Sequence, residues 1–182
     1  MYQLVAILTV SGVLLWFSRR ALAYPGSHGF YRLFAWESIA VLIILNLPYW
    51  FDNPASALQL LSWVLLAASI GLGLSGFLLL RRLGGKRTPG PVGPNFAFEN
   101  TSRLVTSGVY RYMRHPLYGS LLFLGWGAYL KSPSREGSFA VLCASLFLFI
   151  TARVEESENL ARFGEPYALY MKQSWMFIPH LF

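Results

Sequence analysis

The stretch ALQLLSWVLLAASIGLGLSGFLLL, residues 57–80, decides the fold, because no charged side chain interrupts it. A helix rises by about 1.5 Å per residue, so a run of this length can cross the roughly 30 Å hydrocarbon core of a bilayer. Arg81 and Arg82 follow at once and end the run. Residues 57–80 therefore predict a membrane-spanning helix.

The composition and four further apolar runs extend this prediction to the whole chain. Of the 182 residues, 55% are hydrophobic and only 13% are charged, which leaves too little polar surface to cover a water-soluble globule. We expect an all-α integral membrane protein of about five transmembrane helices, in a single membrane domain of residues 1–182. The last two runs are short, so they either cross with the help of flanking turns or form a re-entrant hairpin. The four further runs are residues 2–17, 33–51, 117–130 and 138–152.

The positive charges predict the orientation of the chain. The formal net charge is +7, and the fifteen Lys and Arg residues lie mostly between the apolar runs. If Arg19 and Arg20 are cytoplasmic, thirteen of the fifteen fall on the cytoplasmic side, and only Lys131 and Arg135 fall outside. By the positive-inside rule we expect an external N-terminus and a cytoplasmic C-terminus. The basic excess then requires no nucleic-acid partner.

The His and Cys residues show no metal-binding pattern. His28, His115 and His180 lack the spacing of a metal site, and the single Cys143 lies inside an apolar run. We expect no metal cofactor and no internal disulfide. Glu37 is an acid about one turn inside the second run, where it either pairs locally or serves a function.

The segment LVTSGVYRYMRHPLY, residues 104–118, precedes the fourth run and carries polar groups that could bind a ligand. Pro116 disfavours helical geometry at His115 and is itself a favoured first residue of a helix. His115 therefore marks a helix start, where free backbone N–H groups and a partial positive charge favour an anionic ligand. The same pattern also fits a His that anchors the chain among lipid headgroups.

The fifth run continues without a break signal into RVEESENLARFG, residues 153–164. Gly164 is a typical C-terminal cap, so one helix is predicted to carry the acids out of the membrane. Glu155 lies close to the apolar run, and we expect it to face a cation of a ligand. Glu158 is instead expected to form a solvated pair with Arg162.

Residues 84–95 are rich in Gly and Pro, which argues against a helix. Two interpretations are open. The segment is either a connector or a loop that lies over a cofactor, since Gly allows the backbone to approach a ligand closely.

Three motifs in fixed order point to a known family. They are LVTSGVY at 104–110, RHPLY at 114–118, and the pair Glu155-Glu156 followed by Phe163-Gly164 and Tyr167. Together they resemble the isoprenylcysteine carboxyl methyltransferases and their bacterial relatives, a group also similar to phospholipid methyltransferases. The resemblance covers roughly residues 95–179, and it implies a three-helix N-terminal part (1–80) and a methyltransferase-like catalytic part (81–182).

The resemblance implies a methyltransferase that uses S-adenosyl-L-methionine without a Rossmann domain, and we find no glycine fingerprint after a strand. The acceptor would be a lipophilic small molecule or a membrane lipid, methylated on O, S or N. The location would be the bacterial inner membrane, with the cofactor pocket on the cytoplasmic side. The family's cofactor contacts fall on Ser102, Arg103, Leu104, Val105, Tyr110, His115, Pro116, Leu117, Tyr118 and Glu155, and less clearly on Asn95.

Two departures from the family pattern concern the acceptor. Relatives that methylate a prenylated cysteine tend to carry an Arg four residues before the first acid, where this chain has Thr151, and Gln173 also stands where an Arg is common. We therefore expect farnesylcysteine to be a poor acceptor. Two other functions are compatible with the same residues. They are an NADPH-dependent membrane reductase, since some sterol reductases look similar in this region, and a non-catalytic membrane subunit.

Overall fold

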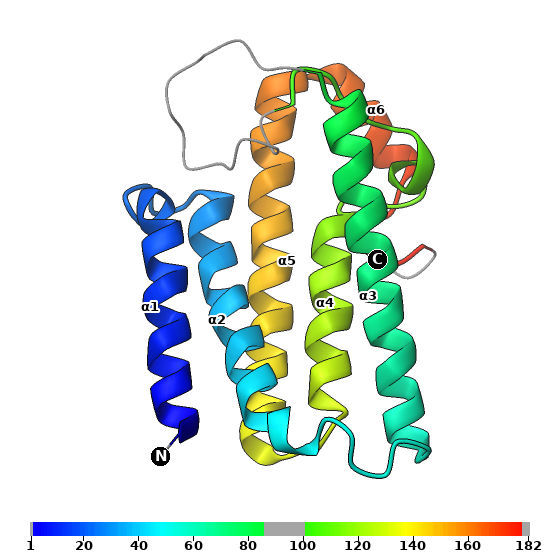
Figure 1. Cartoon of the computed structure of the whole chain (residues 1–182). Coiled ribbons are helices and arrows are strands. Elements are labelled where there is room, and N and C mark those ends of the chain that lie inside the picture. Colours follow the sequence, from blue (N-terminus) through cyan, green and yellow to red (C-terminus); the bar gives the residue numbers. More distant parts are fainter. Residues whose placement is uncertain (1, 86–100, 180–182) are drawn as a thin grey trace.

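The computed structural model describes residues 2–85 and 101–179. These residues contain six α-helices and two short 3-10 helices, joined by turns and loops (Figure 1). No strand occurs among these residues, so the predicted all-α class is confirmed for them. The α-helices are α1 (Tyr2–Leu22), α2 (His28–Asn46), α3 (Ala57–Leu83), α4 (Pro116–Tyr129), α5 (Arg135–Phe163) and α6 (Glu165–Gln173), and the 3-10 helices are η1 (Leu47–Tyr49) and η2 (Gly108–Arg111).

Four of the described helices, α1, α2, α3 and α5, are long and apolar enough to cross a membrane. α4 has 14 residues, so it measures about 21 Å at about 1.5 Å per residue and is short of a full span. The structure thus supports four spans. The fifth span and the orientation of the two termini stay predictions.

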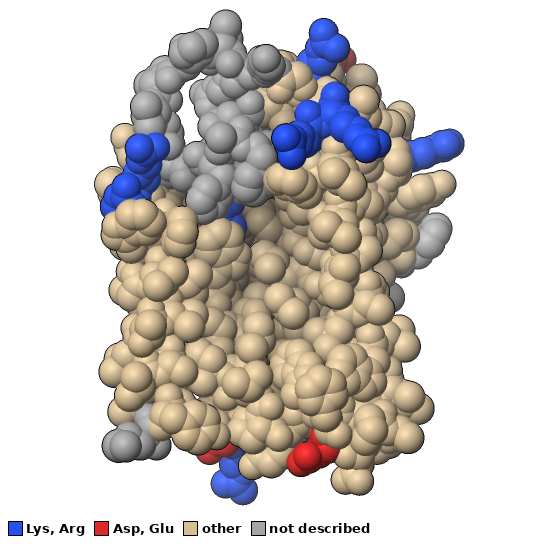
Figure 2. Space-filling model, in the orientation of Figure 1, with Lys and Arg blue, Asp and Glu red and all other residues tan. Residues whose placement is uncertain are grey.

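On the visible face of the bundle, charged side chains lie at both ends and an uncharged belt with many exposed hydrophobic side chains separates them (Figure 2). On the face shown in Figure 2, the Lys and Arg residues gather mainly at the upper end, and the lower end carries a few charges of both signs. Between the two ends no Lys, Arg, Asp or Glu breaks the lower and middle parts of this surface. Such a belt is the surface that a bilayer requires.

Capping residues set helix ends that the apolar runs alone do not define. The Ser27 side chain accepts a hydrogen bond from Phe30 N, so α2 begins at His28. The apolar run had predicted a later start, at Leu33. Arg32, which precedes the apolar run 33–51, therefore lies within α2 and is buried. An Ncap Ser at this position compensates for the unpaired first N–H groups of the helix.

The C-terminal half of α5 agrees with the sequence prediction. α5 continues through Phe163, and Gly164 ends it with a φ of +63°. A side chain is strained in this conformation, which explains why Gly stands there. Pro166 prevents α5 from continuing, and it also helps to start the next helix. It lies in the first turn of α6, a helix that we had not predicted.

α3 and α4 approach closely because small residues lie between them. A Cβ added to Gly127 would lie 2.9 Å from Leu66 Cγ, and one added to Gly76 would lie 3.2 Å from Pro116 Cγ. The start of α4 is thus fixed beside Gly76 of α3. α3 continues for seven residues from Gly76 to Leu83, so the start of α4 lies about 10 Å below the end of α3.

The remaining helices pack in the order α1, α2, α5. α1 packs mainly against α2, where Ser11 Oγ donates a hydrogen bond to Glu37 Oε2 at 2.6 Å. Glu37 therefore pairs locally, with a partner on α1. The main hydrophobic core joins α2, α4 and α5 to the chain after α6, and its buried members are Ala35, Ile39, Tyr118, Ala144, Leu148, Ala152, Met176 and Phe177.

Candidate functional site

The chain after α6 pairs with the residues before α4 and fixes the position of His115. Arg114 N donates to Trp175 O at 2.7 Å, and His115 N donates to Met176 O at 3.1 Å. In return, Trp175 N donates to Tyr112 O at 3.1 Å. His115 is the Ncap residue of α4, as the sequence predicted.

Glu156 is a buried carboxylate that cations from two segments hold in place. It is 2% exposed, and its Oε1 accepts a hydrogen bond from Arg114 Nε at 2.7 Å, while Arg153 Nη1 lies 3.4 Å from Oε2. Arg114 Nη1 also donates to the carbonyls of Met171 and Ser174. A buried ion pair is tolerated when further hydrogen bonds satisfy its polar atoms. Arg114 and Glu156 thus tie α5 to the start of α4 and to the chain after α6.

His115 lies between two carboxylates. Its Nδ1 is 3.6 Å from Glu155 Oε2 and its Nε2 is 3.6 Å from Glu156 Oε1, and the buried Nε2 forms no hydrogen bond. Burial alone would lower the pKa of His115, but the two nearby carboxylates of Glu155 and Glu156 together raise it above its ordinary value. This imidazole therefore stays protonated over a wider pH range than a free His.

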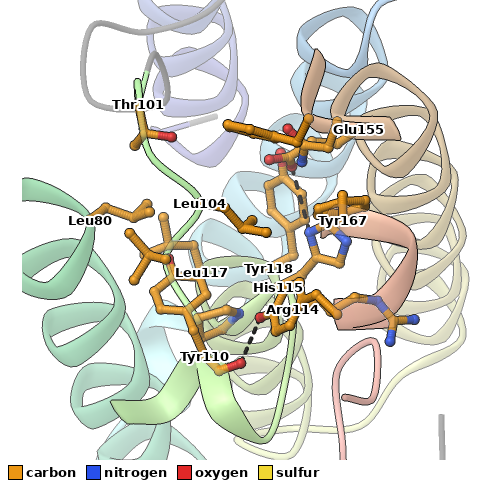
Figure 3. A pocket seen from close by; sticks show the side chains of 15 residues that line it. Leu80, Thr101, Leu104, Tyr110, Arg114, His115, Leu117, Tyr118, Glu155 and Tyr167 are labelled. Atoms are coloured by element: carbon orange, nitrogen blue, oxygen red, sulfur yellow. Dashed lines mark hydrogen bonds and ion pairs between the residues drawn. The ribbon is translucent and has the colours of Figure 1, made fainter. Parts of the chain in front are cut away.

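A pocket opens beside Glu155 and His115 (Figure 3). In Figure 3, Leu80 and Leu117 lie on one side of it, and Glu155, His115 and Tyr167 lie on the other. The pocket is thus apolar on one side and carries charged groups and rings on the other. Its lining residues are Leu80, Thr101, Leu104, Val105, Tyr110, Arg114, His115, Pro116, Leu117, Tyr118, Glu155, Asn159, Phe163, Tyr167 and Tyr170.

The tyrosines of the pocket are neutral wall residues. Burial raises the pKa of Tyr110, Tyr167 and Tyr170, so their hydroxyls stay protonated at physiological pH. Tyr170 Oη donates to Tyr110 O at 2.6 Å, and Tyr110 Oη donates to Gly76 O at 3.4 Å. The Tyr118 ring stacks on His115 with ring centroids 5.5 Å apart. Such packed hydroxyls are suited to shaping the pocket and not to removing a proton.

Residues 58–165 match the family model described as phospholipid methyltransferase. The match covers more than half of the chain and includes all of α4 and α5 and all but the first residue of α3. The chain belongs to the phospholipid methyltransferase family. This membership confirms the resemblance stated above and implies methyltransferase activity in a membrane. No curated protein and no solved structure matches the chain.

For this member of the phospholipid methyltransferase family, most of the sequence-predicted contact residues meet in one place. Ser102 and Arg103 do not line the pocket. Their backbone N–H groups donate to Gly84 O at 2.7 and 3.0 Å, which closes the end of α3, and both residues are exposed. Asn95 and most of the Gly- and Pro-rich segment lie outside the described residues. The predicted residues that line the pocket are Leu104, Val105, Tyr110, His115, Pro116, Leu117, Tyr118 and Glu155.

Several further residues line the pocket that we had not assigned to it. Asn159 follows Glu155 by four residues on α5, so helical spacing already placed the two on one face. Tyr170 and Leu80 carried no sequence signal, because their place depends on how α6 and α3 pack. The other unassigned lining residues are Thr101, Arg114, Phe163 and Tyr167.

The expected solvated pair of Glu158 and Arg162 is wrong. Glu158 Oε2 lies 2.5 Å from His28 Nδ1, and Glu158 Oε1 accepts a hydrogen bond from His28 N at 3.1 Å. Arg162 instead donates to the carbonyl of Thr101. Glu158 therefore fixes the start of α2 to α5. The sequence could not indicate this, because His28 and Glu158 are 130 positions apart.

Proposed function

We propose that this protein is an integral membrane methyltransferase that takes its methyl group from S-adenosylmethionine and transfers it to a lipophilic or membrane-embedded acceptor. The observation that carries the proposal is the Glu155 carboxylate. It lines an aromatic-walled pocket at the start of α4, in a chain of a methyltransferase family.

The residues of the pocket fit the chemical groups of this cofactor. Its ammonium and sulfonium cations suit the Glu155 carboxylate, whose side chain is 25% exposed, and the faces of Tyr118 and Tyr167. Its carboxylate suits the start of α4, where no side chain caps the helix and His115 is readily protonated. Its adenine suits the side of the pocket that Leu80 and Leu117 form.

Each polar residue then has a defined task. The bound cofactor supplies a methyl group on a positively charged sulfur. Glu155 holds the positive part of the cofactor in register, and holding two reactants in line can contribute several kcal/mol to lowering the barrier. Glu156 and Arg114 position His115. If the acceptor is an anion, the transfer needs no general base, and a site that excludes water favours it because charge is neutralised.

The depth of the pocket supports an acceptor that is dissolved in the membrane. The start of α4 lies about 10 Å below the end of α3. Glu155 lies eight residues before the end of α5 at Phe163, which is about 12 Å. If α3 and α5 end at the membrane surface, both distances place the pocket at the boundary between the lipid headgroups and the acyl chains.

A prenylated cysteine is disfavoured as the acceptor. Thr151 is fully buried, and its hydroxyl donates to Phe147 O of the same helix at 2.6 Å. It offers no positive charge to the carboxylate of a prenylated cysteine. We expect little or no turnover of a farnesylcysteine analogue, and robust methylation of that analogue would contradict this expectation.

Calorimetry with purified protein in detergent tests the proposal. S-adenosylhomocysteine is expected to bind and NADPH is not. Incubation with methyl-labelled cofactor and a total lipid extract should then transfer label to the organic phase. Binding of NADPH alone would favour a reductase, and binding of neither compound would favour a non-catalytic subunit.

A further inference from the structure

A second hollow lies on the outside of the wall that encloses the pocket. η2 and its flanking residues form one side, and α6 and Trp175 form the other. Figure 1 shows η2 and α6 close together at the end of the bundle. We call this hollow the η2–α6 groove, and its relevant residues are Arg111, Tyr112, Leu169, Tyr170, Gln173 and Trp175.

The groove combines a cation with amphipathic rings and an apolar side chain. Within residues 2–85 and 101–179, neither the Arg111 guanidinium nor the Gln173 amide forms a side-chain hydrogen bond or an ion pair. Tyr112 is 55% exposed and Leu169 is 51% exposed. A guanidinium and an amide are donors for a phosphate, and exposed aromatic and apolar side chains suit the glycerol and upper acyl region of a lipid.

If α3 ends at the membrane surface, the groove lies at the depth of the lipid headgroups. Trp175 lines the groove, pairs with Met113 and accepts a hydrogen bond from Arg114 N, so the Trp175 side of the groove is level with the start of α4. That start lies about 10 Å below the end of α3. A phosphate at the mouth of the groove and acyl chains along the uncharged belt would therefore match one lipid molecule.

We propose that the η2–α6 groove binds the headgroup phosphate of an anionic phospholipid of the surrounding bilayer, with Arg111 as the phosphate partner. The positive guanidinium has no acidic partner among the described residues, which gives the groove the charge that an anionic lipid complements. Tyr170 separates this groove from the pocket, because it lines both. The inference rests on the membrane setting of the chain and not on methyl transfer.

Lipid titration of the full chain in a neutral detergent tests this site. Dioctanoyl phosphatidylglycerol is the probe, with tryptophan fluorescence and thermal unfolding as readouts. Arg111→Gln should weaken binding by about tenfold or more, the usual effect of losing a charge-assisted hydrogen bond. Lys172→Gln removes the same charge from α6 outside the groove, and it should bind like the parent. Gln173→Ala should weaken binding by a smaller factor.

Two further ligands distinguish the contribution of the phosphate from that of the acyl chains. Inorganic phosphate and dioctanoylglycerol should each bind much more weakly than the phospholipid, because each offers half of the matching chemistry. Parental binding by Arg111→Gln, with unchanged circular dichroism, would overturn the proposal, as would equal affinity for either control ligand. These readouts contain no cofactor, so a failure here is distinguishable from a failure of the proposed methyltransferase function.

Discussion

Two clusters of buried charge lie at opposite ends of the bundle, and they differ in how fully their polar atoms are satisfied. Away from the pocket, Lys131 Nζ donates to Gln59 Oε1 at 2.9 Å and lies 3.1 Å from the ring centroid of Trp63. Gln59 Nε2 in turn donates to the carbonyls of Tyr49 and Lys131, both at 3.2 Å. We call Lys131, Gln59 and Trp63 the distal cluster.

At the pocket end the same kinds of group are left partly unsatisfied. His115 Nε2 is buried without a hydrogen bond, and Glu155 lines the pocket. Unpaired buried polar atoms cost free energy, so His115 Nε2 makes this end less stable than the fully paired distal cluster. The distal cluster thus stabilises the contact between α3 and the α4–α5 turn, whereas the pocket cluster is the one that we propose binds the cofactor.

The largest expected effect comes from Glu156→Ala at the pocket end. This change leaves the buried Arg114 without its carboxylate, and breaking a buried pair costs about 3–5 kcal/mol. The melting temperature in detergent should fall strongly, and binding of S-adenosylhomocysteine should be lost with it. A melting temperature equal to that of the parent would show that this pair does not hold α5, α4 and the C-terminal chain together.

Lys131→Met should have a smaller effect, and only on stability. It removes a cation–π contact and leaves Gln59 Oε1 unpaired, which together cost about 1–3 kcal/mol. Thermal unfolding should shift down while calorimetry gives the parental affinity for S-adenosylhomocysteine. A weakened affinity would contradict the division between a stabilising and a binding end.

The difference between the two ends also explains which features could be predicted from sequence. The helix start at His115 and the end of α5 at Gly164 depend on local rules for Pro and Gly, and both were predicted correctly. The pairing of Glu158 with His28 could not be predicted, because it depends on how α2 packs against α5. Tyr170 was missed for the same reason, since it comes from a helix that begins at a Pro-containing turn.

A pH titration should separate His115 from the distal cluster. Its folded-state pKa is raised above the ordinary value of about 6.5, so its interactions contribute stability below that pH and are lost as pH rises through the folded-state pKa. The melting temperature should therefore fall as pH rises above about 6.5. His115→Ala should flatten this dependence, and an equally steep dependence in the variant would assign the effect to another group.

The smallest expected effect is that of Glu158→Gln. The Glu158 side chain is 37% exposed, and Gln keeps one oxygen that can accept a hydrogen bond from His28. We expect a loss of about 1 kcal/mol in the free energy of unfolding and no change in affinity for S-adenosylhomocysteine. A large loss of affinity would mean that the contact between α2 and α5 shapes the pocket.

The central claim is that Glu155 helps to bind the cofactor. It is tested most directly by measuring the affinity of the Glu155→Gln variant for S-adenosylhomocysteine and comparing it with that of the control variant Glu136→Gln. Both acids lie on α5, but Glu136 is exposed in its first turn, at the other end from the pocket. Our account predicts that Glu155→Gln binds about ten- to a hundredfold more weakly with little change in melting temperature, because a charge-assisted contact is lost, while Glu136→Gln binds like the parent. Equal affinity of both variants and the parent would contradict the assignment of this pocket to the cofactor.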